Sequence, residues 1–232
     1  MSIVVEGLRE GARLLARGDP DVLRAMWLSL WVSGAATAIA CALGIPLGGA
    51  LALARFRGRK VVAALLNTGL GLPPVVVGLA VAMLLWRTGP LGFLHWLYTP
   101  SAVVAAQAVI AFPVVAALTF AAIEGLPPSL DRDLEALGAS RGQRLFILAR
   151  EARLPLLAAI MAGFGAAISE VGAVLMVGGN IRGETRVLTT AIVLETRQGR
   201  FEVAVALAFI LLALTFALNL ALTWVQHGRA KG

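Results

Sequence analysis

The chain has 232 residues, of which 59% are hydrophobic and 14% are charged, whereas about 25% of residues are charged in an ordinary soluble domain. A soluble fold of this size cannot bury that much apolar surface, but a lipid bilayer covers it. The net charge of +7 does not indicate a nucleic-acid partner, because the basic residues lie in gaps between apolar runs and form no stripe with aromatic residues.

The N-terminal segment, residues 1–25, is predicted to lie on the membrane surface as a short amphipathic helix. Apolar residues recur among its charges at helical spacing: Ile3, Val4, Leu8, Ala12 and Leu15. An unstructured terminus is the alternative. Residues 1–24 contain four arginines and four acidic residues without an apolar core, so they do not form a cleavable signal peptide.

Five apolar stretches are each long enough for a membrane-spanning helix of about 20 residues. They are Met26–Ala54, Val61–Trp86, Ser101–Ile123, Leu154–Val177 and Val203–Val225. We therefore expect a transmembrane domain over residues 26–226 and a C-terminal tail over residues 227–232. The predicted fold class is an all-α integral membrane protein with five transmembrane helices.

The first stretch is rich in small residues that allow helix backbones to approach closely in lipid. Gly44 and Gly48 form a G-x-x-x-G motif, and small polar residues recur every four positions: Ser29, Ser33 and Thr37. Prolines lie within or beside the spans, where irregular backbone is tolerated if protein or a cavity surrounds it: Pro46, Pro73, Pro74 and Pro113. This pattern predicts a bundle that encloses a pathway, although purely structural bundles share it.

The segment between the third and fourth stretches, residues 124–153, is predicted to form two short helices. Pro127 and Pro128 end the third span, after which Ser129 caps the first short helix. Asp131 and Asp133 then lie in its first turn, where acidic residues suit the helix dipole.

Gly138 interrupts that helix, and Ser140 followed by Gln143 forms a capping box that starts the second. One face of the second helix is apolar: Leu145, Leu148, Ala149 and Ala152. The chain then enters the fourth span through Leu154-Pro155. Two helices joined at a glycine and held at the membrane surface suit docking into a groove on a soluble partner.

Basic residues orient membrane proteins because they stay on the cytoplasmic side. If residues 124–153 are cytoplasmic, the inner side carries 11 basic residues and the outer side carries 9, together with seven acidic residues. This small difference favours an outer N-terminus and a cytoplasmic C-terminus.

The run Glu135-Ala136-Leu137-Gly138-Ala139-Ser140, followed by Leu154-Pro155, resembles the cytoplasmic coupling loop of ABC importer permeases. The resemblance implies that these six residues contact an ATP-binding subunit and carry its motion to the spans. Two positions depart from the family's pattern. Arg132 stands where the family has a glutamate, and the Leu-Pro pair follows Gly138 about one helical turn later than usual.

Other runs resemble the molybdate- and sulfate-type permeases of this family. Two correspond to the second span: Leu72-Pro73-Pro74-Val75-Val76-Val77-Gly78-Leu79 and Arg87-Thr88-Gly89-Pro90-Leu91-Gly92. Two correspond to the fourth span and its outer exit: Ser169-Glu170-Val171-Gly172-Ala173 and Gly178-Gly179-Asn180-Ile181. Further details resemble the tungstate branch, namely Arg150-Glu151-Ala152-Arg153 and residues 185–196.

The resemblance implies an importer that moves an oxyanion, with tungstate favoured and molybdate or sulfate as alternatives. Two ATP-binding subunits would dock on the inner side, and an extracytoplasmic substrate-binding protein would deliver the anion. Because five spans are too few to enclose a pore comfortably, we expect a symmetric homodimer in the inner membrane. No cofactor is expected, and the chain is expected to be no enzyme.

Three charged residues are candidates for the gate or pathway, together with Gly178, Gly179 and Asn180. Glu170 is a charged residue deep within a span, where it serves either a gate or helix packing. Arg182 and Arg186 follow the fourth span, and their guanidinium groups suit an oxyanion. Contact with lipid headgroups or with the binding protein is the alternative for both arginines.

Several other functions are not supported by the sequence. Residues 138–142 match the hydrolase pattern G-x-S-x-G, but a short helix rather than a strand is predicted before them. No P-loop motif is present, and Cys41, the only cysteine, allows neither a disulfide framework nor a Cys-based metal site. A secondary transporter would show inverted repeats and several intramembrane charges, and neither is apparent.

Overall fold

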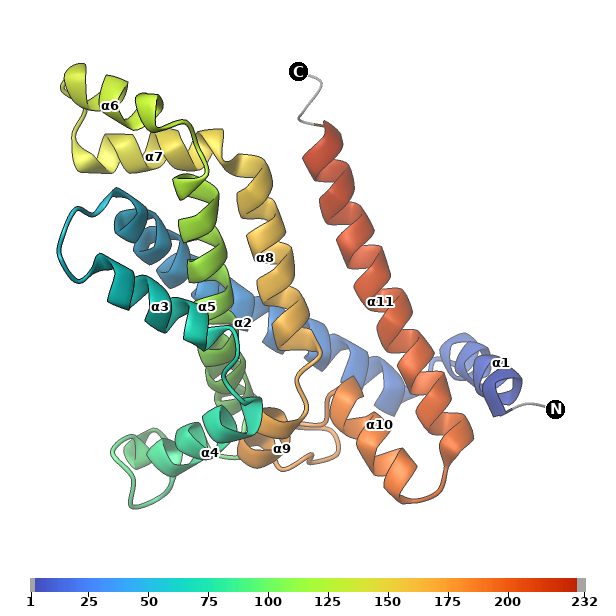
Figure 1. The fold of residues 1–232 in the computed structure, drawn as a ribbon. Helices are drawn as coiled ribbons and strands as arrows, with labels where there is room; N and C mark the ends of the chain where they lie inside the picture. The colour runs from blue at the N-terminus through green and yellow to red at the C-terminus, as the bar shows by residue number, and fades with distance from the viewer. Residues whose placement is uncertain (1–2, 229–232) are drawn as a thin grey trace.

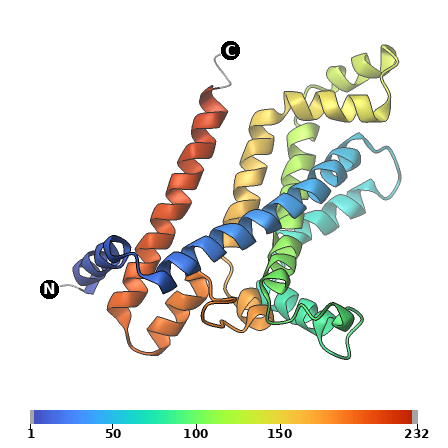
Figure 2. The ribbon, with the colours of Figure 1, turned by 180° about the vertical axis from the view of Figure 1, so that it is seen from behind.

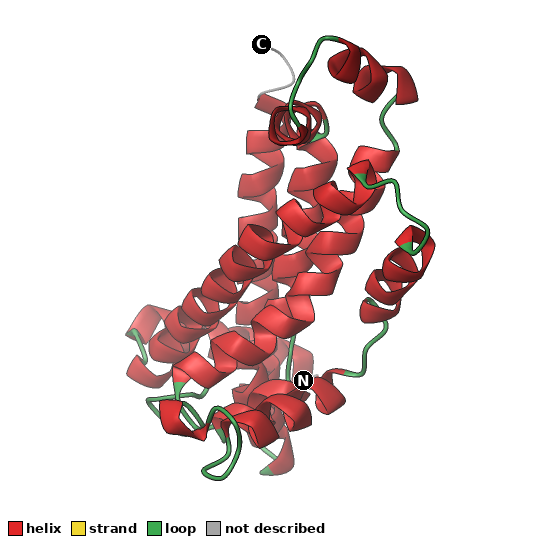
Figure 3. Cartoon of the chain, turned by 90° about the vertical axis from the view of Figure 1, so that its left-hand side faces the viewer, coloured by secondary structure: helices red, strands yellow, loops and turns green. Residues whose placement is uncertain are grey.

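The structure is a computed structural model and describes residues 3–228, apart from the side chains of Leu222 and of residues 225–228. Of the predicted tail, residues 229–232 lie outside the described residues. Within the described range every regular element is a helix (Figure 3). The helices are α1 (Ile3–Arg17), α2 (Pro20–Leu53), α3 (Arg59–Gly69), α4 (Pro74–Leu85), the 3₁₀ turn η1 (Gly92–Leu94), α5 (Pro100–Glu124), α6 (Pro128–Ala136), α7 (Arg141–Glu151), α8 (Arg153–Ile168), α9 (Gly172–Gly178), α10 (Leu188–Arg197) and α11 (Phe201–Gly228).

The bundle has two distinct ends (Figures 1 and 2). The hairpin formed by α6 and α7 lies at one end, together with the C-terminal end of α11. Helices α1, α4, α9 and α10 lie at the other end. Helices α2, α5, α8 and α11 run between them.

The membrane-spanning elements are three long helices and two bent pairs. Helices α2, α5 and α11 are each long and apolar enough to cross a membrane, and the count reaches five if each bent pair is one span. The chain bends by 97° between α3 and α4, and by 58° between α8 and α9. The second and fourth predicted spans, Val61–Trp86 and Leu154–Val177, are therefore bent pairs of helices and not single straight ones.

Local chemistry explains the first bend. Gly71 precedes Pro73, whose backbone is extended at φ −63° and ψ 119°, and Pro74 then opens α4. Proline has no N–H with which to continue a helix, but it fits the first helical turn. Pro46 and Pro113, by contrast, lie inside α2 and α5 without ending either helix.

The central contact of the bundle joins α2 to α5, as the G-x-x-x-G motif predicts. A Cβ atom at Gly44 would lie 3.1 Å from the backbone nitrogen of Ala116, and one at Gly48 would clash with the Ala116 carbonyl oxygen. The two backbones are thus packed as closely as glycine permits. Ser33 lies on the same helix and donates a hydrogen bond of 3.2 Å to Gln107 Oε1 on α5, where both side chains are buried.

The N-terminal part of the chain contains two further features. α2 begins at Pro20 rather than Met26, because the Asp19 carboxylate accepts hydrogen bonds from the N–H groups of Asp21 and Val22 at 3.0 and 3.1 Å. α1 packs on α11 through its buried glycines Gly7 and Gly11. Apolar residues of α1 are exposed, including Ile3, Val4, Leu8 and Leu15. Their contact with a membrane surface stays a prediction.

The glycine contact between α2 and α5 predicts a position-specific loss of stability. Gly48→Leu inserts a side chain where the Ala116 carbonyl oxygen lies, so we expect the free energy of unfolding in detergent to fall by about 1–3 kcal/mol. Gly34→Leu is the matched control, because a Cβ atom at Gly34 meets nothing within 4 Å. Thermal unfolding followed by tryptophan fluorescence would measure both, and equal losses would contradict this account.

Candidate functional site

The tip of the α6–α7 hairpin projects from one end of the bundle (Figure 1). In the run 135–140 every residue is exposed except Ala139, which is half-buried, and Leu137 is 84% exposed. Gly138 has φ +79°, a left-handed conformation that favours glycine, and a Cβ atom added there would meet nothing within 4 Å. The tip therefore makes a sharp turn that is open to an incoming partner.

The start and the base of α7 follow the sequence prediction. The Ser140 N–H donates to Gln143 Oε1 at 2.8 Å, and the Gln143 N–H donates to Ser140 Oγ at 3.4 Å, which completes the capping box. The predicted apolar face packs against Ile123 and Leu156 of the chain's own spans. One detail is wrong: α6 begins at Pro128, so Ser129 lies inside this helix and does not cap it.

A network of ion pairs holds the two helices of the hairpin together. Arg144 of α7 is buried and donates two hydrogen bonds to Asp131 of α6, at 2.8 Å from Nε and 2.7 Å from Nη2. Arg144 also lies 3.3 Å from Glu135, which in turn lies 3.3 Å from Arg55 beyond the end of α2. Hydrogen bonding to Asp131 raises the pKa of the Arg144 guanidinium, so this arginine stays charged although it is buried.

Glu170 lies in the bend between α8 and α9. This residue is buried, and its side-chain Oε1 accepts a hydrogen bond of 2.8 Å from the Ala173 N–H in the first turn of α9. Its carbonyl oxygen accepts a hydrogen bond of 2.9 Å from the Thr189 hydroxyl of α10. The carboxylate thus caps a helix that starts inside the protein, and this stabilises the bend.

The two bends face each other across a cavity of about 220 Å³. Its lining comes from both breaks and from α5: Gly69, Leu70, Leu72, Pro74, Ile110, Val114, Ala166, Ser169 and Glu170. Next to it α4 and α9 pack closely, since a Cβ atom at Gly78 would lie 2.5 Å from Ala173 Cα. Ser169 and Glu170 are the polar lining residues. The cavity therefore has a carboxylate in its wall and lies where two helices are interrupted.

The loop from Gly178 to Arg186 is held by its own polar groups. Gly179 and Asn180 have positive φ values of 69° and 54°. The Thr185 hydroxyl is buried, donates to the Gly178 carbonyl and accepts from the Ile181 N–H. Arg186 donates to the side-chain and backbone oxygens of Asn180, both at 3.3 Å. These hydrogen bonds therefore define the path of the loop.

Arg182 pairs with a carboxylate at the start of α2. Its guanidinium donates to both carboxylate oxygens of Asp21, with Nε at 3.1 Å from each. This hydrogen bonding raises the pKa of Arg182. Arg182 and Arg186 share a cavity of about 260 Å³ with one further arginine and three carboxylates, namely Arg200, Asp19, Asp21 and Glu195. The positive charge that an oxyanion would need is therefore balanced by the protein itself.

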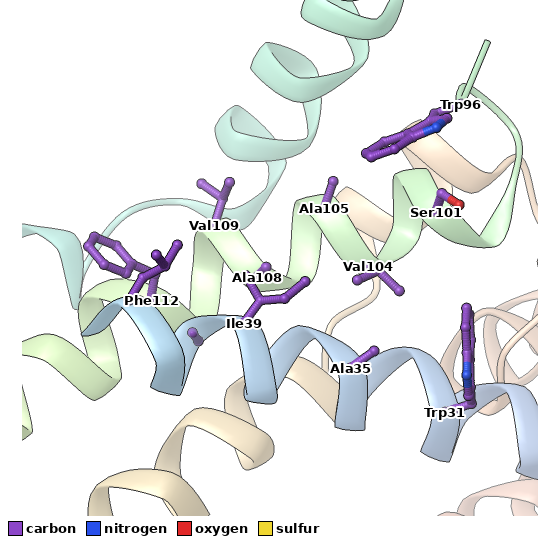
Figure 4. Close-up of a pocket in the computed structure, with 12 residues that line it drawn as sticks. Trp31, Ala35, Ile39, Trp96, Ser101, Val104, Ala105, Ala108, Val109 and Phe112 are labelled. Atoms are coloured by element: carbon purple, nitrogen blue, oxygen red, sulfur yellow. The ribbon is translucent and has the colours of Figure 1, made fainter. Parts of the chain in front are cut away.

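A groove of about 590 Å³ lies between α2 and α5 (Figure 4). Trp31 and Trp96 lie toward one end of it, and Phe112 lies at the other. Apart from Ser101 and the two indole N–H groups its lining is apolar. This groove suits a hydrocarbon surface and offers no charged group to an anion.

Comparison with known proteins identifies the family to which this arrangement belongs. Residues 44–231 match the family described as binding-protein-dependent transport system inner membrane component. The chain belongs to this family. It is therefore a multi-pass inner membrane permease of an ABC importer, as its sequence motifs predict.

The relatives of this permease include importers of anions. It is 40% identical to the tungstate uptake system permease protein TupB of Peptoclostridium acidaminophilum over 98% of this chain and 100% of the relative. It is 43% identical to a probable anion ABC transporter permease protein of Haloferax volcanii, over 83% and 85% of the two chains. The inward-facing MetNI methionine ABC transporter shares the fold, with a TM-score of 0.72, 18% identity and coverage of 89% and 95%.

Sequence reasoning missed the ion pairs of the hairpin. It assigned Glu135 to partner contact, which stays a prediction, and did not foresee that this carboxylate also pairs with Arg55 and Arg144. One signal was available. Arg144 lies four positions before Leu148, on the face of α7 that is buried, and a buried arginine requires a carboxylate partner.

The capping role of Glu170 predicts that its two simplest substitutions differ. Glu170→Gln keeps an oxygen that accepts from the Ala173 N–H, so stability in detergent should change little. Glu170→Ala leaves that N–H without its acceptor and should lower the free energy of unfolding by about 1–3 kcal/mol. Thermal unfolding measures both, with Ser169→Ala as the neighbouring control. Equal losses for Gln and Ala would show that the charge, and not the cap, is what matters.

Proposed function

We propose that two copies of this permease form the membrane pore of an ABC importer that carries tungstate into the cell. The observation that supports this most is the α6–α7 hairpin, whose tip is exposed while its base is packed on the spans. ATP binding in two separate subunits would close them together and move the two hairpins. The spans would then alternate between inward-open and outward-open states. The permease itself carries out no bond chemistry.

The tip residues 135–140 supply the surface for the ATP-binding subunit, with Leu137 as its apolar contact. The bends around Glu170 and the loop from Gly178 to Arg186 form the outer gate region. There Arg182 and Arg186 hold the loop in place, and neither binds the anion directly. Their pairing with Asp21 and Asn180 supports this role.

The choice of anion rests on the relatives and on the binding protein. The tungstate permease of Peptoclostridium acidaminophilum aligns over nearly the whole chain, which supports tungstate over molybdate or sulfate. Tungstate and molybdate are nearly equal in size and charge, so the pore has little physical basis for separating them. We therefore propose that the extracytoplasmic binding protein selects the anion.

Reconstitution into vesicles tests this function. With ATP and the ATP-binding subunit inside, and binding protein with tungstate outside, we expect tungstate to accumulate only when all components are present. Arg182→Ala and Arg186→Ala should change tungstate and molybdate uptake by the same factor. Uptake without ATP would support a secondary transporter instead, and a variant that loses only one anion would place selectivity in the pore.

We also propose that the hairpin and the C-terminus are cytoplasmic and that the N-terminus is outside. Single cysteines in a Cys41→Ala background test this orientation. Gly142→Cys in α7 and Glu184→Cys in the outer loop suit labelling, because both positions are exposed. A membrane-impermeant maleimide added to intact cells should label position 184 and not position 142. The reverse pattern would overturn the topology and the docking of the ATP-binding subunit with it.

A further inference from the structure

The ion-pair network of the hairpin suggests a role beyond docking. We propose that Arg144 is a positioning residue that makes α6, α7 and the end of α2 move as one body, so that motion at the tip reaches the spans. The proposal rests on the proposed function of the hairpin. It is carried by four charged residues from three parts of the chain: Arg55, Asp131, Glu135 and Arg144.

Helix α6 depends on this network more than α7 does. No residue of α6 is buried, although Leu130 and Leu134 are partly covered by the apolar cluster at the hairpin base. α7, by contrast, places Leu148 in that cluster at 2% exposure. Gly138 joins the two helices in a left-handed conformation with open space around it. Apart from its short connection to α5 and these partial contacts, α6 therefore relies on a further link to follow α7.

Arg144 supplies that link in a geometry which resists rotation. Its guanidinium meets the Asp131 carboxylate through two parallel hydrogen bonds, which fix orientation as well as distance. Only 9% of the Arg144 side chain is exposed, so water competes little for these bonds. A lysine keeps the charge but cannot form the planar pair.

Arg55, just beyond the end of α2, extends the link toward the spans, and Arg59 at the start of α3 joins the ends of α2 and α5. Arg55 lies 3.3 Å from Glu135 and 3.7 Å from Asp131, although it is exposed and each of its pairs is weak alone. Arg59 donates to the carbonyl oxygens at the end of α2 and to Glu124 at the end of α5, at 2.9 Å. Arg55 thereby connects the hairpin to the end of α2, and Arg59 in turn holds the end of α2 against the end of α5.

The first experiment uses the purified permease alone. Hydrogen–deuterium exchange over residues 128–137 should be faster in Arg144→Gln than in the unmodified protein, while exchange in α5 stays the same. Arg150→Gln, an exposed arginine on the same helix, is the matched control and should change nothing. Unchanged exchange of α6 in Arg144→Gln would overturn the proposal whether or not the chain is an ABC importer subunit.

The second experiment uses the complete importer in vesicles and measures anion uptake per ATP hydrolysed. Arg144→Gln should lower this ratio about tenfold, the size expected for loss of a charge-assisted pair, while ATP hydrolysis continues. The ratio for Arg144→Lys should lie between those of Arg144→Gln and the unmodified importer. This variant still tests the proposal if Arg144→Gln does not assemble. An unchanged ratio in both variants would overturn the proposal, whereas absent uptake in the unmodified importer would refute only the proposed function.

A covalent link separates positioning from a requirement for charge. Asp131→Cys with Arg144→Cys, in a Cys41→Ala background, removes the ion pair and allows a short thiol crosslinker to replace it. We expect low uptake per ATP before crosslinking and recovery after it. If the crosslinked importer stays uncoupled, rigidity between α6 and α7 is not what Arg144 provides.

Discussion

The contact between α2 and α5 is the interaction on which the rest of the structure depends. Lipid tails are as apolar as the helices, so helices in a membrane associate by close packing and by hydrogen bonds between them. Glycines on four neighbouring elements each abut α5: Gly48, Gly69, Gly163 and Gly178. α5 is therefore the axis to which α2, both broken spans and their bends are fitted, and small residues are required wherever the backbones meet.

A second constraint explains where the polar residues inside the bundle are used. Backbone N–H and C=O groups at a helix break have no water to bind within the hydrocarbon region, so the protein must supply their partners. Glu170 caps α9, Thr189 binds the carbonyl of Glu170, and Ser29 accepts from the Leu188 N–H at the start of α10. The breaks are thus stabilised by side chains that a continuous helix would not require.

Charges are used differently at the two ends of the molecule. At the end that carries the hairpin, ion pairs between arginines and carboxylates link the end of α2 to α6 and α7, and the tip of the hairpin stays exposed. At the other end, Arg182 and Arg186 fasten a loop to Asp21 and Asn180. Both sets of pairs bind residues that lie on different elements or at different points of a loop, and each fixes the backbone around it.

The sequence by itself determined the class of protein, the apolar spans, the glycine motif at Gly44 and Gly48 and the capping box at Ser140, because each depends on neighbouring residues or on composition. The family motifs were readable for the same reason. The bends and helix α10 could not be predicted from the sequence, because apolar runs look alike whether the helix continues or breaks. The partners of Arg182 and Arg144 were decided only by the tertiary structure. Asp21 lies 161 positions from Arg182, and only the packing of α2 against the loop from Gly178 to Arg186 brings the two charges together.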